Sequence, residues 1–195
     1  MIDYDLFSSL IEYNKYRKKC FDNFEQPIIN KDLERLLNAR YSKVSRIKKR
    51  FLYLLIHSKN VYFCTFTFDN AHIDCSDRTK KDYIKHSLFK FDDKCLIIMN
   101  RDFGKNTDRE HYHVILGTNN DDDILKNLYY PFRFNVERVR IDKYSFKKLS
   151  KYINKLSNHC IKDSTNRSRI YYNFKGFKFF TAIDYRHTIS LLSMT

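Results

Sequence analysis

Apolar side chains recur at intervals of three and four residues along the first part of the chain, a spacing typical of one face of a helix. The pair Gln26-Pro27 interrupts this pattern, and a second helix is predicted over residues 31–58. The repeating apolar positions are Leu6, Leu10, Tyr13 and Tyr16 in the first helix, and Leu33, Leu36, Leu37, Val44, Ile47, Phe51 and Leu54 in the second.

The pattern changes at residue 61, where β-branched and aromatic residues run through to residue 68. Such a run is typical of a strand that is buried on both faces. Further strands are predicted over residues 95–99, 111–116 and 132–141, and a turn at residues 102–106 precedes the strand at 111–116. An edge strand or hairpin is possible within residues 167–180. Helices are predicted over residues 77–90, 123–128 and 144–159.

From residue 61 onward the elements therefore alternate as β, α, β, β, α, β, α. This order predicts an α+β fold, with an antiparallel central sheet of four or five strands and helices on one face. We expect three parts: an N-terminal helical extension at residues 1–58, the main domain at residues 59–182, and a C-terminal tail at residues 183–195.

Charge narrows the choice of partner. The 195 residues include 37 Lys and Arg against 23 Asp and Glu, a net charge of +14, which favours a polyanion such as nucleic acid. The 15 Tyr and 17 Phe could also supply rings on which unpaired bases stack. A solvated charged surface and an AT-rich genome would account for part of the same composition. Residues 40–50 of the second helix hold six cations and no acid: Arg40, Lys43, Arg46, Lys48, Lys49 and Arg50.

The cysteines and the apolar runs indicate the cellular compartment in which the protein is expected. The five cysteines are widely spaced and form no Cys-x-x-Cys pair, so neither a disulfide framework nor a zinc ribbon is expected. No apolar run approaches the length of a membrane span, and the first residues lack the basic start of a signal peptide. We therefore expect a cytoplasmic protein without a membrane partner.

Two histidines in the third strand are candidate metal ligands. Strand side chains alternate between faces, so His111 and His113 share one side of the sheet, about 7 Å apart along the strand. An imidazole pair completed by oxygen ligands suits Mn²⁺, Zn²⁺ and related cations. The same pair could also serve only to satisfy hydrogen bonds.

The helix over residues 144–159 holds a candidate nucleophile. Tyr152 lies at the border of its apolar stripe, with Lys148, Lys155 and His159 beside it. Neighbouring positive charge favours the phenolate form that attacks phosphorus. An amphipathic helix with a border tyrosine would give the same pattern.

Taken together, three segments in this order resemble the three motifs of rolling-circle replication initiators of the HUH endonuclease superfamily, which occur in small phages, plasmids and single-stranded DNA viruses. The resemblance covers roughly residues 61–178. The segments are Phe63-Cys64-Thr65-Phe66-Thr67-Phe68-Asp69, Arg109-Glu110-His111-Tyr112-His113-Val114-Ile115-Leu116 and Lys151-Tyr152-Ile153-Asn154-Lys155.

The resemblance implies an HUH or ferredoxin-like sheet and a single-tyrosine enzyme. It makes His111 and His113 ligands of a divalent metal, Mn²⁺ or Mg²⁺, and Tyr152 the nucleophile, with Lys155 stabilising charge on the phosphate. Relatives often carry Glu-aromatic-Gly before the histidines, and here Asp102-Phe103-Gly104 makes Asp102 the third ligand. The other carboxylates considered for that place are Asp69 and Glu110.

The implied substrate is single-stranded or hairpin origin DNA in a host cell. Because no phosphate-binding loop occurs, a host helicase is expected to unwind the DNA, and a host polymerase would extend the free 3′ hydroxyl. The expected DNA contacts are Lys143, Lys147, Lys148, Lys151, Arg167, Arg169, Tyr171, Tyr172, Lys175 and Lys178.

Three alternatives remain. A single-tyrosine transposase or a small relaxase of the same superfamily would also join His-x-His to a tyrosine helix. A non-catalytic nucleic-acid-binding module of the RRM type would use the aromatic sheet as a stacking platform and would need no metal. A cupin-like metal enzyme also uses His-x-His on strands, but the expected glycine-rich turns are missing.

Overall fold

The structure is a computed structural model that describes residues 10–26, 31–103, 109–121, 131–140, 142, 144–149, 170–174, 186, 188 and 190. The chain divides into two compact units, Met1–Ile47 and Lys48–Thr195. The division falls inside a helix, earlier in the chain than the predicted boundary at residue 58. No helix within the described ranges is long and apolar enough to cross a membrane.

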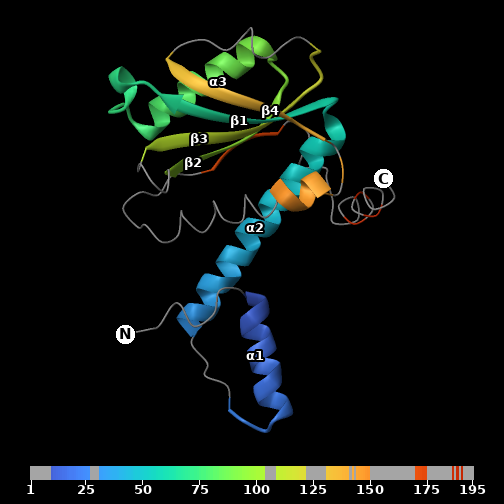
Figure 1. The fold of residues 1–195 in the computed structure, drawn as a ribbon. Coiled ribbons are helices and arrows are strands. Elements are labelled where there is room, and N and C mark those ends of the chain that lie inside the picture. The colour runs from blue at the N-terminus through green and yellow to red at the C-terminus, as the bar shows by residue number, and fades with distance from the viewer. Residues whose placement is uncertain are drawn as a thin grey trace. The chain divides into compact units, whose positions relative to one another are not determined.

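The two predicted N-terminal helices are confirmed (Figure 1). Helix α1 is Leu10–Asp22, and helix α2, Lys31–His57, begins in the first unit and continues into the second. Tyr13 from α1 packs with Leu33 and Leu37 from α2, and all three are almost completely buried. An ion pair of 3.2 Å between Arg17 and Glu34 also joins the two helices.

The second unit is built on a five-stranded sheet in the order β4-β1-β3-β2-β5, in which every pairing is antiparallel. The predicted α+β fold is therefore confirmed, and β5 lies in the stretch for which an edge strand or hairpin was considered. The predicted helix at residues 123–128 lies outside the described residues, as does residue 150 onward of the helix predicted at 144–159. The strands are β1 Asn60–Phe68, β2 Leu96–Phe103, β3 Glu110–Thr118, β4 Phe132–Val139 and β5 Tyr171–Asn173.

One face of the sheet is covered by helix α3, Asp77–Phe91 (Figure 1). Ser76 caps the start of α3 by accepting a hydrogen bond of 3.1 Å from the backbone N–H of Thr79. Ile84 and Leu88 of α3 are fully buried against the sheet. The sheet residues of this core are Cys64, Phe66, Phe68, Ile97, Met99, Tyr112, Val114, Leu116 and Phe132, which alternate along their strands as the period of two requires.

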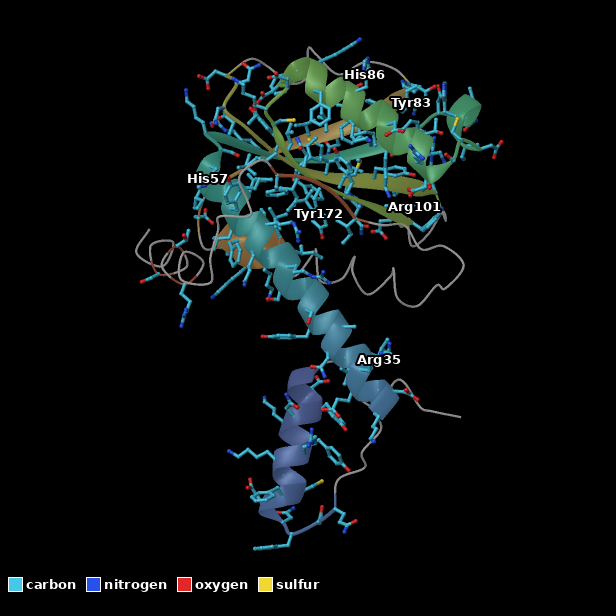
Figure 2. All side chains as sticks on the ribbon, turned by 180° about the vertical axis from the view of Figure 1, so that it is seen from behind. Arg35, His57, Tyr83, His86, Arg101 and Tyr172 are labelled. Atoms are coloured by element: carbon cyan, nitrogen blue, oxygen red, sulfur yellow. The ribbon has the colours of Figure 1, made fainter. Side chains whose placement is uncertain are left out.

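The opposite face receives the C-terminal part of α2, a layer that the sequence did not predict. Figure 2 shows Tyr83 and His86 on α3 and Tyr172 on the other side of the sheet. There the guanidinium of Arg50 lies 4.3 Å from the centre of the Tyr172 ring, and Phe51 stacks on Phe146 with ring centres 5.6 Å apart. The end of the predicted N-terminal extension is thus part of the sheet domain.

Gly117 of β3 lets α2 approach the sheet. A Cβ atom at this position would lie 2.7 Å from Cγ of Leu54 and still closer to the hydroxyl of Ser58. Contacts that close require a neighbour to move, and both neighbours are buried. The absence of a side chain at Gly117 is therefore a packing requirement.

We expect Gly117→Ala to lower the free energy of unfolding by about 1–3 kcal/mol, since it overpacks this contact. Urea unfolding followed by circular dichroism measures the loss. Leu54→Ala vacates the space that the new methyl group would enter, so the double variant should lose less stability than the sum of the two single variants. Strictly additive losses would contradict the close approach.

Candidate metal centre

The two histidines of β3 each face a threonine of β1. In the antiparallel pairing of these strands, Thr65 lies opposite His113. The hydroxyl of Thr65 is 3.1 Å from Nδ1 of His113, and the hydroxyl of Thr67 is 3.0 Å from Nδ1 of His111. Two parallel Thr–His hydrogen bonds therefore join β1 to β3 on the face opposite α3.

These bonds define which ring nitrogen can bind a cation. A threonine hydroxyl can accept a hydrogen bond from Nδ1–H, and the imidazole then presents the Nε2 lone pair as its ligand atom. Histidine ligands in proteins commonly donate the other ring N–H to a fixed acceptor, which orients the ring and sets the tautomer. With Nδ1–H as the donor, both histidines have the arrangement that is common among metal ligands.

Asp102 lies on the same face of the sheet. Asp102 and Phe103, predicted to lie in a turn at residues 102–106, belong to strand β2, because the β2–β3 ladder includes the pair Asp102 and His111. The rest of the predicted turn lies outside the described residues. Oδ2 of Asp102 is 3.6 Å from Nε2 of His113. The other carboxylate oxygen accepts a hydrogen bond of 2.9 Å from the backbone N–H of Phe103.

The spacing of His113 and Asp102 fits a shared cation. A metal with bonds of about 2.1 Å to each atom spans their 3.6 Å separation at an angle of about 120°. His111 lies farther away, since its ring centre is 6.3 Å from that of His113. Within the described part of the chain, no three His, Cys, Asp or Glu residues stand close enough to hold a metal. His113 and Asp102 are thus the close pair, and His111 would have to turn about its side-chain torsions to join them.

The environment of His111 favours the neutral imidazole that a metal ligand must be. Burial lowers the pKa of His111, and the nearby His113 and Arg109 lower it further. The carboxylates of Asp102 and Glu110 act in the opposite direction, but the net pKa shift is downward.

Glu110, considered from the sequence as a metal ligand, points to the other face of the sheet. Its carboxylate is ion-paired with the buried Lys80 and with Arg101, whose Nε is 2.5 Å from Oε1. The same oxygen accepts a hydrogen bond of 3.1 Å from the hydroxyl of Tyr112. Glu110 therefore holds α3 and β2 to β3 from the side opposite His111.

Asp69, the other carboxylate considered as a metal ligand, also makes contacts away from the histidines. It caps the short 3-10 helix η1, Asn70–His72, and accepts a hydrogen bond of 3.1 Å from the backbone N–H of His72. Its carboxylate is 2.7 Å from Nδ1 of the His72 ring. Among the three carboxylates considered, Asp102 is the one placed beside the histidines.

Tyr112, which lies between the two histidines in the sequence, is unsuited to nucleophilic attack. It is fully buried under α3. Burial raises its pKa, and the carboxylates of Asp77 and Glu110 raise it further. Its hydroxyl donates a hydrogen bond of 3.0 Å to Asp77. Tyr112 is therefore a structural residue of the core.

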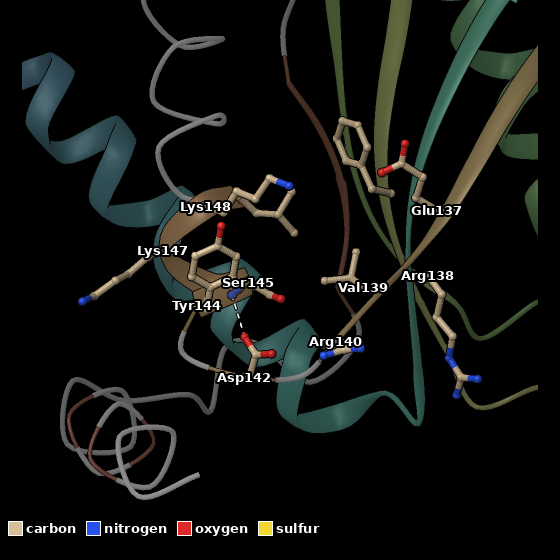
Figure 3. A pocket seen from close by; sticks show the side chains of 11 residues that line it. Glu137, Arg138, Val139, Arg140, Asp142, Tyr144, Ser145, Lys147 and Lys148 are labelled. Carbon is tan, nitrogen blue, oxygen red and sulfur yellow. Dashed lines mark hydrogen bonds between the residues drawn. The ribbon is translucent and has the colours of Figure 1, made fainter.

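The remaining predicted site residues fall largely outside the described part of the chain. This is so for Tyr152, Lys155, Lys151, Arg167, Arg169 and Lys175. Lys148 is described: it is exposed on the helical segment at residues 144–149 and lines a pocket beside β4 (Figure 3).

The fold and the His113–Asp102 pair define an α+β protein with a candidate metal centre on one face of its sheet. Neither a protein-family model nor a curated protein sequence matches the chain. Among solved structures, the chain is similar to the hypothetical protein ORF119 from Sulfolobus islandicus rod-shaped virus 1. The two are 20% identical with a TM-score of 0.43, over 63% of this chain and 99% of that one.

Removing the threonine hydroxyls should weaken metal binding. Thr65→Val and Thr67→Val keep the side-chain shape but take away the partner of Nδ1, so we expect Mn²⁺ to bind about 10- to 100-fold more weakly. Titration calorimetry measures the affinity, and Thr65→Ser should largely restore it. Thr79→Val, at an exposed position on α3, is the matched control. Equal affinities for Thr65→Val and Thr79→Val would show that the hydroxyl does not orient the ring.

Substitutions of Asp102 and Glu110 should differ in their effects on the free energy of unfolding and on metal affinity. Glu110→Gln leaves the ammonium of Lys80, only 4% exposed, without its charge partner, so we expect a loss of about 3–5 kcal/mol in the free energy of unfolding. Asp102→Asn should cost less than about 1.5 kcal/mol but should weaken Mn²⁺ binding. Urea unfolding and Mn²⁺ titration of both variants test this, and the reverse pattern would make Glu110 the ligand.

Proposed function

We propose that the protein is a metal-dependent endonuclease that nicks single-stranded DNA through a covalent tyrosine intermediate, as replication initiators of the HUH type do. The observation that carries the proposal is the pairing of His113 with Asp102, on a sheet face where threonine hydroxyls orient both histidines. Further support comes from the order of the three sequence motifs and from the net charge of +14.

In the proposed reaction, the phenol oxygen of Tyr152 attacks the scissile phosphorus. The bond from phosphorus to the 3′ oxygen breaks, and that oxygen takes a proton to become a free 3′ hydroxyl. The downstream strand stays attached as a 5′-phosphotyrosine, so a later attack by a 3′ hydroxyl rejoins DNA without ATP.

Other side chains of the protein would hold the cation and stabilise charge on the phosphate. His113 and Asp102, with His111, would hold a divalent cation, Mn²⁺ or Mg²⁺, which supplies Lewis-acid polarisation of the phosphate. Lys155, one helical turn from Tyr152 in the predicted helix, would stabilise negative charge on the phosphate oxygens. The helix predicted to carry Tyr152 begins in the segment whose Phe146 packs on Phe51 of α2, the layer covering this same face of the sheet.

The biological setting that fits this activity is the start of replication of a small circular replicon. The nick would supply a 3′ hydroxyl to a host polymerase, and a host helicase would separate the strands. Origin DNA, single-stranded or folded as a hairpin, would be the substrate, in the cytoplasm of the host cell. A transposase or relaxase of the same superfamily would use the same chemistry on different DNA.

The decisive test is a covalent adduct between the protein and DNA. The probe is a library of single-stranded oligonucleotides with a randomised central segment and a fluorophore at the 3′ end, incubated with Mn²⁺. Nicking transfers the labelled downstream fragment to the protein, which a denaturing gel detects. We expect Tyr152→Phe and EDTA each to abolish the labelled adduct, and His113→Ala to reduce it at least about tenfold.

Tyr83→Phe, on α3 across the sheet, is the matched tyrosine control and should form the adduct normally. An adduct that persists in Tyr152→Phe would refute the assigned nucleophile, and one that persists in EDTA would refute the metal centre. A non-catalytic binding module would retain the oligonucleotides without forming any adduct.

A further inference from the structure

A pocket of about 940 Å³ lies beside the candidate metal centre. Figure 3 shows it between the edge strand β4 and the helical segment at residues 144–149. This volume is near the upper end of the range for pockets that bind small molecules. Its lining residues are Phe63, Glu137, Arg138, Val139, Arg140, Asp142, Tyr144, Ser145, Lys147, Lys148 and Leu149.

Phe63 connects the pocket to the metal centre. Its ring lines the pocket and also stacks on the ring of His113, with centres 5.5 Å apart and planes inclined by 14°. One aromatic side chain therefore links the pocket to a candidate metal ligand. A strand with a phosphate at His113 would bring a neighbouring nucleotide to the pocket.

The lining combines aromatic rings with excess positive charge. Four cations stand against two carboxylates. One group of each sign is engaged: Asp142 accepts a hydrogen bond of 2.6 Å from the backbone N–H of Ser145, and Arg138 donates one of 2.6 Å to Asn60. Tyr144, which lines the pocket, is 74% exposed. The exposed Lys147 and Lys148 follow it on the same segment. Rings that stack on bases beside cations that contact phosphates are the usual elements of single-strand binding.

We propose that this pocket receives an unpaired nucleobase of the DNA strand, which Tyr144 and Phe63 contact while Lys147 and Lys148 bind the flanking phosphates. The position of that base beside the scissile phosphate rests on the proposed function. Binding of the base itself needs neither a metal nor the nicking reaction. The pocket would thus hold the strand in register before the phosphate reacts.

The test compares two probes of equal length and charge in EDTA: a fluorescent oligothymidylate, and the same backbone with abasic sites throughout. Fluorescence anisotropy gives both affinities. We expect the wild-type protein to bind oligothymidylate about five- to thirtyfold more tightly than the abasic strand. Tyr144→Leu should remove most of this preference, and Tyr144→Phe, which keeps the ring, should retain it.

Phe63→Leu should also reduce the preference, and Tyr144→Leu provides the result if Phe63→Leu fails to fold. Tyr83→Leu, on the other side of the sheet, is the matched control and should keep the wild-type preference. Lys148→Gln should weaken the binding of both probes equally and lower the salt dependence of binding by about one counterion.

Equal affinity of the wild-type protein for the two probes would overturn the proposal. The same holds if Tyr144→Leu weakens the binding of both probes equally. Because the assay contains no metal and measures no cleavage, failure of the nicking reaction leaves its result unchanged. Conversely, a protein that forms the covalent adduct but shows no preference for bases would retain the proposed function and refute only this pocket assignment.

Discussion

The register between β1 and β3 is the constraint on which the candidate metal centre depends. It places Thr65 opposite His113 and brings Thr67 within hydrogen-bonding distance of His111. A shift of one residue would turn the side chains of one strand to the opposite face. The large apolar residues that alternate with these polar ones oppose such a shift, because Phe66 and Val114 fill the core under α3. Core packing on one face thereby fixes the polar geometry on the other.

The two faces of β3 hold charged groups in different ways. Under α3, Glu110 is enclosed with Lys80 and Arg101, where opposite charges and hydrogen bonds compensate for the loss of water. On the other face, the Asp102 carboxylate faces the Nε2 atom of His113 at a distance that leaves room for a cation. The first arrangement pairs every charge with an opposite charge of the protein. The second is the arrangement to which we assign the proposed cation.

Much of the fold could be predicted from the sequence, because strand and helix periods are strong over residues 31–58, 61–68 and 111–116. The shared face of His111 and His113 followed from alternation alone. The same alternation could have shown that Glu110 points away from the histidines, since adjacent residues of a strand point to opposite faces.

Other features depend on contacts that local patterns do not encode. The place of Asp102 depends on how far the β2–β3 ladder extends, and a pattern that also fits a turn does not reveal this. Lys80 and Lys81 would be expected in solvent, yet both are buried. Lys80 is ion-paired with Glu110 of β3, and Lys81 with Asp77 one turn earlier in α3. The packing of α2 on the sheet depends on the absence of a side chain at Gly117, a requirement that no local pattern in the sequence reveals.

The central place of β3 also determines how this region can move. Since β1 and β2 flank β3 on both sides, its backbone amides are protected by two neighbouring ladders. Such strands exchange their amide hydrogens only through the largest opening events, close to global unfolding. The backbone that carries His111 and His113 is therefore among the slowest parts of the fold to open. If the proposed cation binds, the adjustment that brings His111 to it would come from side-chain torsions of His111, since the strand beneath it is held on both sides.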